Sequence, residues 1–218
     1  MLTQLTFMKR LGGAGLVFLI SCLSGCVTPF GISEDKKREV LSQLSSMNLK
    51  EYSAMIEGFG AMGVMKELEP SFRYHGVIGC ATAGNAEAQF ELIEEVYLRW
   101  PNALFDIDAH SMGAGPAEEL ARLCNRRGIK IKNMRLYGPF QQIRVPAGVE
   151  NFIEFRSDDG YAFQGPAYTR GNLESQETSF SVRELHSTHM SLPGDAMGNV
   201  FSSRTRQRRI HQKTCPRA

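Results

Sequence analysis

The sequence predicts an α/β fold, a three-layer sandwich built around a mainly parallel sheet. Segments with strand character alternate with amphipathic helices over residues 70–203, which is typical of a parallel sheet covered on both faces. No internal repeat or low-complexity stretch interrupts this alternation. The 193 residues that follow position 25 are enough for one domain with a hydrophobic core.

Residues 1–25 have the pattern of an export signal. Lys9 and Arg10 precede the uncharged run "LGGAGLVFLISCLSGC", which is shorter than the roughly 20 apolar residues of a membrane-spanning helix. The run ends in "LSGC", which resembles the bacterial lipobox, although an uncleaved anchor is the alternative. The resemblance implies that Cys26 is lipidated and that its acyl chains anchor the protein in a membrane of the cell envelope, on the exported side. Because Val27 follows the cysteine, the periplasmic face of the outer membrane is expected if the source is Gram-negative.

The composition after residue 25 points to no polyanionic partner. Lys and Arg together number 23, and so do Asp and Glu, so we expect no nucleic-acid partner. We predict no metal site and no cofactor, because the sequence has no CxxC, P-loop, dinucleotide fingerprint or metal-spaced cluster. Cys80, Cys124 and Cys215 allow at most one disulfide, and we interpret the first two as small buried hydrophobes. No feature predicts an oligomeric state.

The segments outside the predicted core are a tether, a helical stretch and a tail. Residues 26–32 form the lipidated tether, and residues 33–69 are predicted to be helical. Within that stretch, one helix follows Ser33, and a second follows Asn48 and ends at Pro70. The basic tail, residues 204–218, is predicted to be solvated, with weak attraction to anionic headgroups as the alternative.

The core, residues 70–203, is predicted to alternate strands and helices in a fixed order. Pro101 ends its first helix and Gly128 ends its second. The expected elements are a strand at 72–80, a small-residue loop at 81–85, a helix at 86–100, a strand at 103–108, a helix at 115–128, and strands at 133–138, 151–156 and 180–185.

Ser111 lies just after the predicted strand "ALFDID", at the point where a helix begins. Catalytic groups of an open parallel sheet gather at the carboxyl ends of its strands. A serine nucleophile on such a turn needs small neighbours and a helix directly after it, so that the next backbone N–H faces the developing oxyanion. Ala109 and Gly113 are the small neighbours. Ser111 is therefore the candidate nucleophile.

The segment "HSMG" resembles the nucleophile elbow of the α/β-hydrolase family, usually G-x-S-x-G, with Ala109 in place of the first glycine. The resemblance covers roughly residues 72–202 and is greatest to lipases, esterases and thioesterases. It implies an α/β-hydrolase-like fold and a serine hydrolase that acts on carboxylic ester or thioester bonds. The alternative is a non-catalytic envelope lipoprotein that uses the same scaffold for binding or assembly.

In this family the acid and then the histidine follow the serine in the chain. Asp158 and Asp159 follow the strand 151–156, and we favour Asp159 because lipase-like members tend to place the acid second. His186 and His189 follow the last strand, and we favour His189 as the base, although geometry decides between them. His110 adjoins the nucleophile, but the resemblance implies that it points away from the site.

The oxyanion hole of the family combines two backbone N–H groups. The resemblance implies that Met112 supplies one, and that the loop after the strand 72–80 supplies the other, from Ala81 or alternatively Thr82. Several apolar residues near the site would suit an acyl chain, although core packing explains them equally well. They are Met112, Phe140, Phe163 and Met190.

Overall fold

The computed structural model describes residues 32–46, 51–58, 64–74, 78–83, 85–159 and 164–200, all within one compact unit, Gly31–Ala218. The predicted signal, Cys26, Phe163, Cys215 and the tail 204–218 lie outside these ranges. No helix within them is long and apolar enough to cross a membrane.

Six parallel strands form one sheet in the order β2-β1-β3-β4-β5-β6. The strands are β1 (Glu51–Glu57), β2 (Ile78–Ala83), β3 (Leu104–His110), β4 (Ile131–Tyr137), β5 (Val149–Ser157) and β6 (Ser179–Leu185). All their carboxyl ends therefore lie along the same edge of the sheet.

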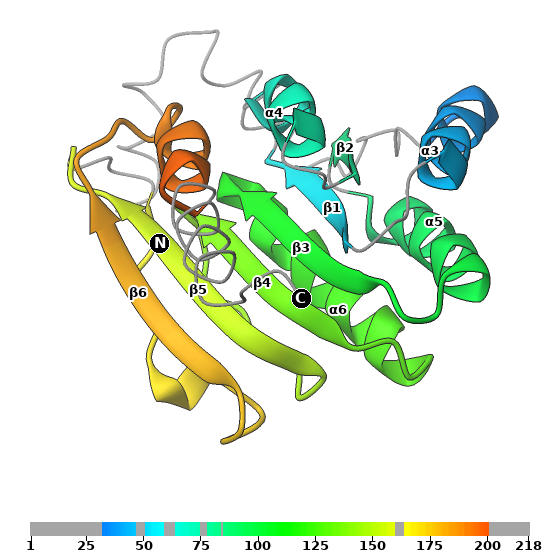
Figure 1. Cartoon of the computed structure of the whole chain (residues 1–218). Helices are drawn as coiled ribbons and strands as arrows, with labels where there is room; N and C mark the ends of the chain where they lie inside the picture. Colours follow the sequence, from blue (N-terminus) through cyan, green and yellow to red (C-terminus); the bar gives the residue numbers. More distant parts are fainter. Residues whose placement is uncertain are drawn as a thin grey trace, which may run out of the picture. The chain divides into compact units, whose positions relative to one another are not determined.

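Helices cover both faces of this sheet, which confirms the predicted α/β class (Figure 1). The labelled helices are α3 (Glu34–Ser46), α4 (Val64–Tyr74), α5 (Ala86–Arg99) and α6 (Ala114–Arg126), with a further helical stretch at 192–200. The larger apolar cluster joins α3, α5 and α6 to one face. The smaller cluster joins Met65 of α4 and Leu192, Ala196 and Met197 to Met55, Tyr137 and Phe155 on the other face.

The helix predicted after Asn48 is wrong, because residues Glu51–Glu57 form strand β1. This strand lies between β2 and β3, and six of its seven residues are buried. A strand buried on both faces has no alternating pattern of apolar and polar residues, so its apolar run can be mistaken for one side of a helix. The sheet therefore begins at Glu51, within the stretch predicted to be helical, and not after Pro70.

The segment around Pro70 also differs from the prediction. Pro70 lies inside α4 instead of ending a helix, and residues 72–74, expected in a strand, belong to the same helix. Strand β2 begins only at Ile78 and includes Ala81, which was expected in a loop. Proline disfavours a helix interior but does not exclude it, and here the helix continues for four residues beyond it.

From α5 onward the predicted elements are confirmed, with ends that move by a few residues. Gly128 has φ +76°, and its amide donates to the Asn125 carbonyl at 3.1 Å just after α6, as expected for a glycine at a helix end. Cys124 is free and fully buried on α6, which confirms its interpretation as a small hydrophobe.

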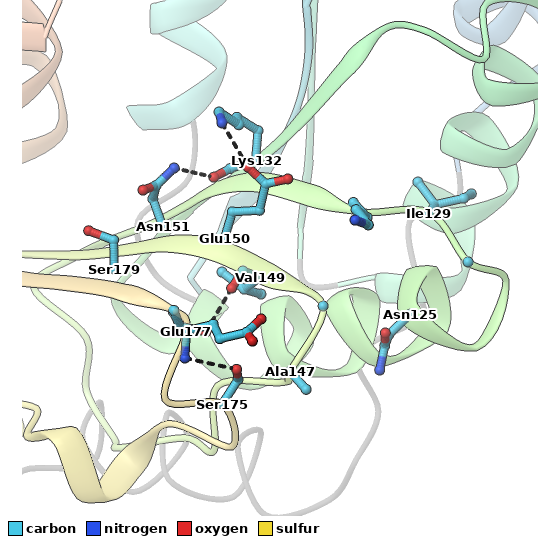
Figure 2. A pocket seen from close by; sticks show the side chains of 14 residues that line it. Asn125, Ile129, Lys132, Ala147, Val149, Glu150, Asn151, Ser175, Glu177 and Ser179 are labelled. Carbon is cyan, nitrogen blue, oxygen red and sulfur yellow. Dashed lines mark hydrogen bonds and ion pairs between the residues drawn. The ribbon is translucent and has the colours of Figure 1, made fainter.

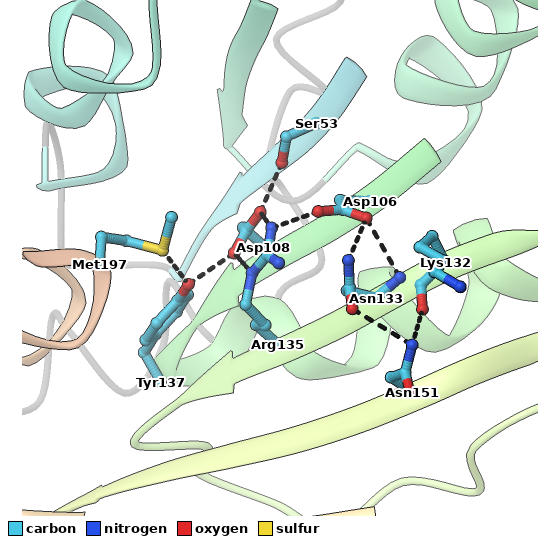
Figure 3. Close-up of polar contacts among 9 residues, drawn as sticks. All are labelled: Ser53, Asp106, Asp108, Lys132, Asn133, Arg135, Tyr137, Asn151 and Met197. Atoms are coloured by element: carbon cyan, nitrogen blue, oxygen red, sulfur yellow. Dashed lines mark hydrogen bonds and ion pairs between the residues drawn. The ribbon is translucent and has the colours of Figure 1, made fainter. Parts of the chain in front are cut away.

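A buried polar network lies on the face of the sheet opposite the larger cluster (Figure 3). Arg135 on β4 donates to two carboxylates of β3, from Nη2 to Asp106 at 2.6 Å and from Nε to Asp108 at 2.6 Å. The Ser53 and Tyr137 hydroxyls also donate to Asp108. The network ties the three central strands β1, β3 and β4 to one another through side chains.

The pKa values of the two aspartates in this network are shifted in opposite directions. Burial raises the pKa of Asp106 to about 7, although Arg135 opposes the shift. Burial acts in the same direction on Asp108, but Arg135, Ser53 and Tyr137 hold the pKa of that carboxyl below its ordinary value. At neutral pH, Asp108 is therefore the more fully ionised of the two carboxyl groups.

Replacing Arg135 with methionine should lower the free energy of unfolding by about 3–5 kcal/mol, because it leaves buried carboxylates without their cation. The matched control is Lys132→Met on the same strand, whose partner is Glu150 and whose side chain is 42% exposed. That variant should lose no more than about 1 kcal/mol. The measurement is urea denaturation of both variants. Equal decreases in the free energy of unfolding would contradict the claim that the buried network stabilises the fold more than the exposed ion pair does.

Candidate active site

Ser111 occupies a strained turn at the carboxyl end of β3. The strand ends at His110, a short 3-10 turn covers Ser111–Gly113, and α6 begins at Ala114. Ser111 has φ +55°, which no other described residue except glycine shares. Such a conformation costs on the order of 1–3 kcal/mol and persists only where surrounding contacts impose it. The strand, the strained serine and the helix have the arrangement that a nucleophile elbow requires.

Two glycines allow the end of β1 to pack directly on this turn. A Cβ on Gly58 would lie 2.7 Å from the His110 carbonyl oxygen and from the Met112 nitrogen, and a Cβ on Gly113 would lie 2.7 Å from the Ile56 carbonyl oxygen. Backbone atoms cannot move away as a flexible side chain can. These contacts explain the glycine at the end of the predicted motif, and they add Gly58 to the residues that shape the turn.

The geometry corrects one half of the predicted oxyanion hole. The Met112 N–H lies in the first turn after the strand, where backbone donors have no partner within the helix. Ala81 pairs in register with Met55, and Thr82 with Ile56, so both lie on β2 with β1 between them and β3. The residue that meets the Met112 nitrogen is instead Gly58, directly after β1. The next residues, 59–63, lie outside the described part of the chain.

His189 lies against the elbow, although it comes from far along the chain. Its ring meets the end of β4, where a Cβ on Gly138 would lie 2.6 Å from its Nδ1. Its carbonyl oxygen lies 3.0 Å from Nε2 of His110, the residue before Ser111. The described part of the chain shows no hydrogen bond from the Ser111 hydroxyl to this ring. Such bonds are often long in proteins without substrate and tighten when it binds.

The two aspartates pair with different histidines. Asp159 accepts a hydrogen bond from the backbone N–H of His189 at 3.0 Å. Asp158 lies 2.8 Å from Nδ1 of His186, whose side chain is fully exposed. His189 is 3% exposed by contrast. Asp159 is thus joined to the backbone of His189, while the alternatives form a pair of exposed side chains.

Burial and charge act in opposite directions on His189. Burial lowers its pKa below the ordinary value, and the Asp159 carboxylate opposes this shift. The pKa of His186 is instead raised, because its hydrogen bond with Asp158 favours the charged ring. Of the two rings, His189 is accordingly the one that is more fully in the neutral form, which can accept a proton.

No family model and no curated protein matches this sequence. Several solved structures are similar to it. They include the NocB thioesterase domain from the nocardicin cluster (TM-score 0.45, 11% identity, 66% of this chain and 87% of that one), the type II thioesterase BorB from the borrelidin cluster (0.46, 10%, 73% and 93%) and lipase B of Aspergillus fumigatus (0.43, 10%, 70% and 50%). At these identities the likenesses say nothing about substrate.

Three large apolar side chains are exposed on residues that adjoin the candidate site. Phe140 donates its backbone N–H to the Ser111 carbonyl oxygen at 3.3 Å, and Met112 and Met190 directly follow Ser111 and His189. All three side chains are more than a third exposed. They are half of the six large exposed apolar side chains of the described residues; the others are Leu98, Leu104 and Val182. We call Met112, Phe140 and Met190 the apolar rim.

A hollow of about 660 Å³ lies at the other edge of the sheet, where β4, β5 and β6 begin (Figure 2). Its lining includes the exposed ion pair of Lys132 with Glu150. It is open to solvent and lies at the end of the strands opposite Ser111. Among the described residues, no cluster of three or more His, Cys, Asp or Glu side chains could hold a metal ion.

Proposed function

We propose that this protein is a serine hydrolase that cleaves carboxylic ester or thioester bonds. Ser111 is the nucleophile, His189 the general base and Asp159 the acid that stabilises the charged histidine. The observation that carries the proposal is the positive φ of Ser111 on a strand-to-helix turn. A serine in an ordinary loop can adopt a relaxed backbone conformation, whereas the serine of a nucleophile elbow is held in a strained one.

The reaction needs three contributions from these residues. His189, largely neutral at pH 7 because burial lowers its pKa, takes the proton from Ser111 as the hydroxyl attacks the carbonyl carbon. Asp159 stabilises the imidazolium that forms, and the same ring then returns the proton to the leaving group. The Met112 N–H donates to the oxyanion that forms.

The apolar rim supports an acyl group as the part of the substrate next to the scissile carbonyl. Apolar side chains exposed around a nucleophile lose contact with water when an alkyl chain covers them, which favours binding by about 25 cal/mol per Å². Lipidation of Cys26, proposed from the "LSGC" motif, would hold the enzyme at a membrane of the cell envelope. Outer-membrane attachment is our proposal for a Gram-negative source.

The second candidate function is a non-catalytic envelope lipoprotein. It is favoured by the hydrogen bond that Asp159 accepts from His189, because the donor is the backbone N–H, whereas a catalytic acid holds the ring of its histidine. Under this alternative the elbow remains as part of a binding scaffold.

A fluorophosphonate probe separates the two candidates. The wild-type protein should be labelled, and peptide mass spectrometry should place the adduct on Ser111, because only an activated serine attacks the probe. Ser111→Ala should abolish labelling. Ser175→Ala, in the loop that lines the hollow at the opposite edge, is the matched control and should label like the wild type. Well-folded wild-type protein that resists the probe would support the binding scaffold.

The pH dependence of kcat/KM distinguishes the two aspartates. In the wild type, activity should rise with pH through a pKa below 6.5, because burial lowers the pKa of His189 and the neutral ring is the active form. Asp159→Asn should move this limb to still lower pH, since the carboxylate raises that pKa, and should reduce kcat by about 10-fold or more.

The matched control for that change is Asp158→Asn. It removes the partner of the exposed His186 and should leave kcat within about twofold of the wild type and the pH limb unmoved. If the larger loss followed Asp158→Asn instead, the acid would be assigned to the wrong residue.

A further inference from the structure

His110 joins the strand that carries the nucleophile to the loop that carries the proposed base. It is the last residue of β3, fully buried, and directly precedes Ser111. Its Nε2 lies 3.0 Å from the His189 carbonyl oxygen. The two rings also pack together, with centroids 4.6 Å apart and planes inclined by 37°. One buried side chain therefore contacts both the backbone and the ring of a residue 79 positions later.

The chemistry of these contacts specifies the protonation of His110. A carbonyl oxygen only accepts hydrogen bonds, so Nε2 must carry the proton that is donated to His189. Burial lowers the pKa of His110 to about 4, and the neighbouring His189 acts in the same direction. The ring is therefore neutral at physiological pH, with its single proton on Nε2. Its Nδ1 is buried and has no hydrogen-bond partner among the described residues.

A residue that only filled space in the core would not need the hydrogen bond of His110 to His189. An apolar side chain could occupy the same volume without burying an unpaired ring nitrogen, which is unfavourable. The histidine adds what an apolar side chain lacks, a directed donor to the backbone of His189. The His189 ring thus lies close both to His110 and to the chain at Gly138, directly after β4.

We propose that His110 is a positioning residue for the hydrolase reaction, which holds the loop of His189 against the elbow through its Nε2–H donor and its ring. The proposal rests on the proposed function, because it assigns His110 a role through the base. His110 itself touches no reacting atom. The resemblance to the hydrolase elbow implies only that His110 points away from the site, and the link of His110 to His189 adds a role beyond that.

Three substitutions separate the donor from the ring. In His110→Gln, the side-chain amide nitrogen can take the place of Nε2 and keep the donor. In His110→Asn the amide corresponds to Nδ1 and is too short to reach the His189 carbonyl. In His110→Phe the ring remains for packing, but the donor is lost. The Gln and Asn variants thus carry the same amide group, and they differ only in whether that group can reach the His189 carbonyl oxygen.

The measurements are kcat, KM and the pH profile with a p-nitrophenyl ester, with circular dichroism to establish that each variant folds. His110→Asn and His110→Phe should reduce kcat by about 10²-fold with KM within about twofold, because a displaced base affects the chemical step more than binding. His110→Gln should recover activity to within about fivefold of the wild type.

The pH profile adds a measurement that a purely structural role would leave unchanged. The shorter side chain of His110→Asn should leave His189 less buried, so the pKa of the base should rise toward its ordinary value, and the acid limb should move to higher pH. In His110→Gln the limb should stay where it is in the wild type.

The outcomes separate this proposal from the proposed function. If all three folded variants hydrolyse the ester as the wild type does, with unchanged pH profiles, His110 has no positioning role although the hydrolase remains. If the wild type neither hydrolyses the ester nor reacts with the probe, both proposals fail. In that case ¹⁵N NMR of the histidines still reports whether Nε2 of His110 carries the proton, and so whether the contact itself exists.

Discussion

The candidate site depends on how closely the end of β1 approaches the turn after β3. At Gly58 and at Gly113, a single added carbon would fall within 2.7 Å of backbone atoms of the facing segment. This close contact restricts the backbone conformation between His110 and α6. Within that stretch Ser111 adopts the strained conformation with φ +55°. A nucleophile elbow uses such a turn to hold a serine hydroxyl and the following backbone N–H where a substrate carbonyl can meet both.

The buried polar face of the sheet links this turn to the rest of the molecule. Asp106, Asp108 and His110 alternate along β3, so their side chains share one face of the sheet. The first two bind Arg135, and the third contacts His189. On β4, Tyr137 donates to Asp108 and is followed by Gly138, which makes room for the ring of His189. The interactions that fix the central strands therefore continue into those that hold the proposed base.

The elbow could be predicted from the sequence because its signal is local: small residues around a serine between a strand and a helix. Strand β1 could not be predicted, because a strand buried on both faces lacks the alternation of apolar and polar residues. The second oxyanion donor was therefore expected after β2, although β1 lies between β2 and β3; the order of strands in a sheet is not a local property of the sequence. Pairing of Asp159 with His189, and not with His186, depends on folded geometry alone. The sequence also carries a signal for the buried network. Polar residues alternate at 106, 108 and 110 and at 133, 135 and 137 on two neighbouring strands, with two aspartates on the first strand and one arginine on the second.

The most direct test of this account is the rate at which a fluorophosphonate labels Ser111 in Gly58→Ala. An added Cβ at Gly58 must displace the backbone of the elbow, so the folded variant should react at least about 10²-fold more slowly than the wild type. Gly198→Ala, where a Cβ meets nothing within 4 Å, should react at the wild-type rate. Wild-type labelling of a folded Gly58→Ala protein would contradict the claim that close packing of β1 on this turn creates the reactive serine.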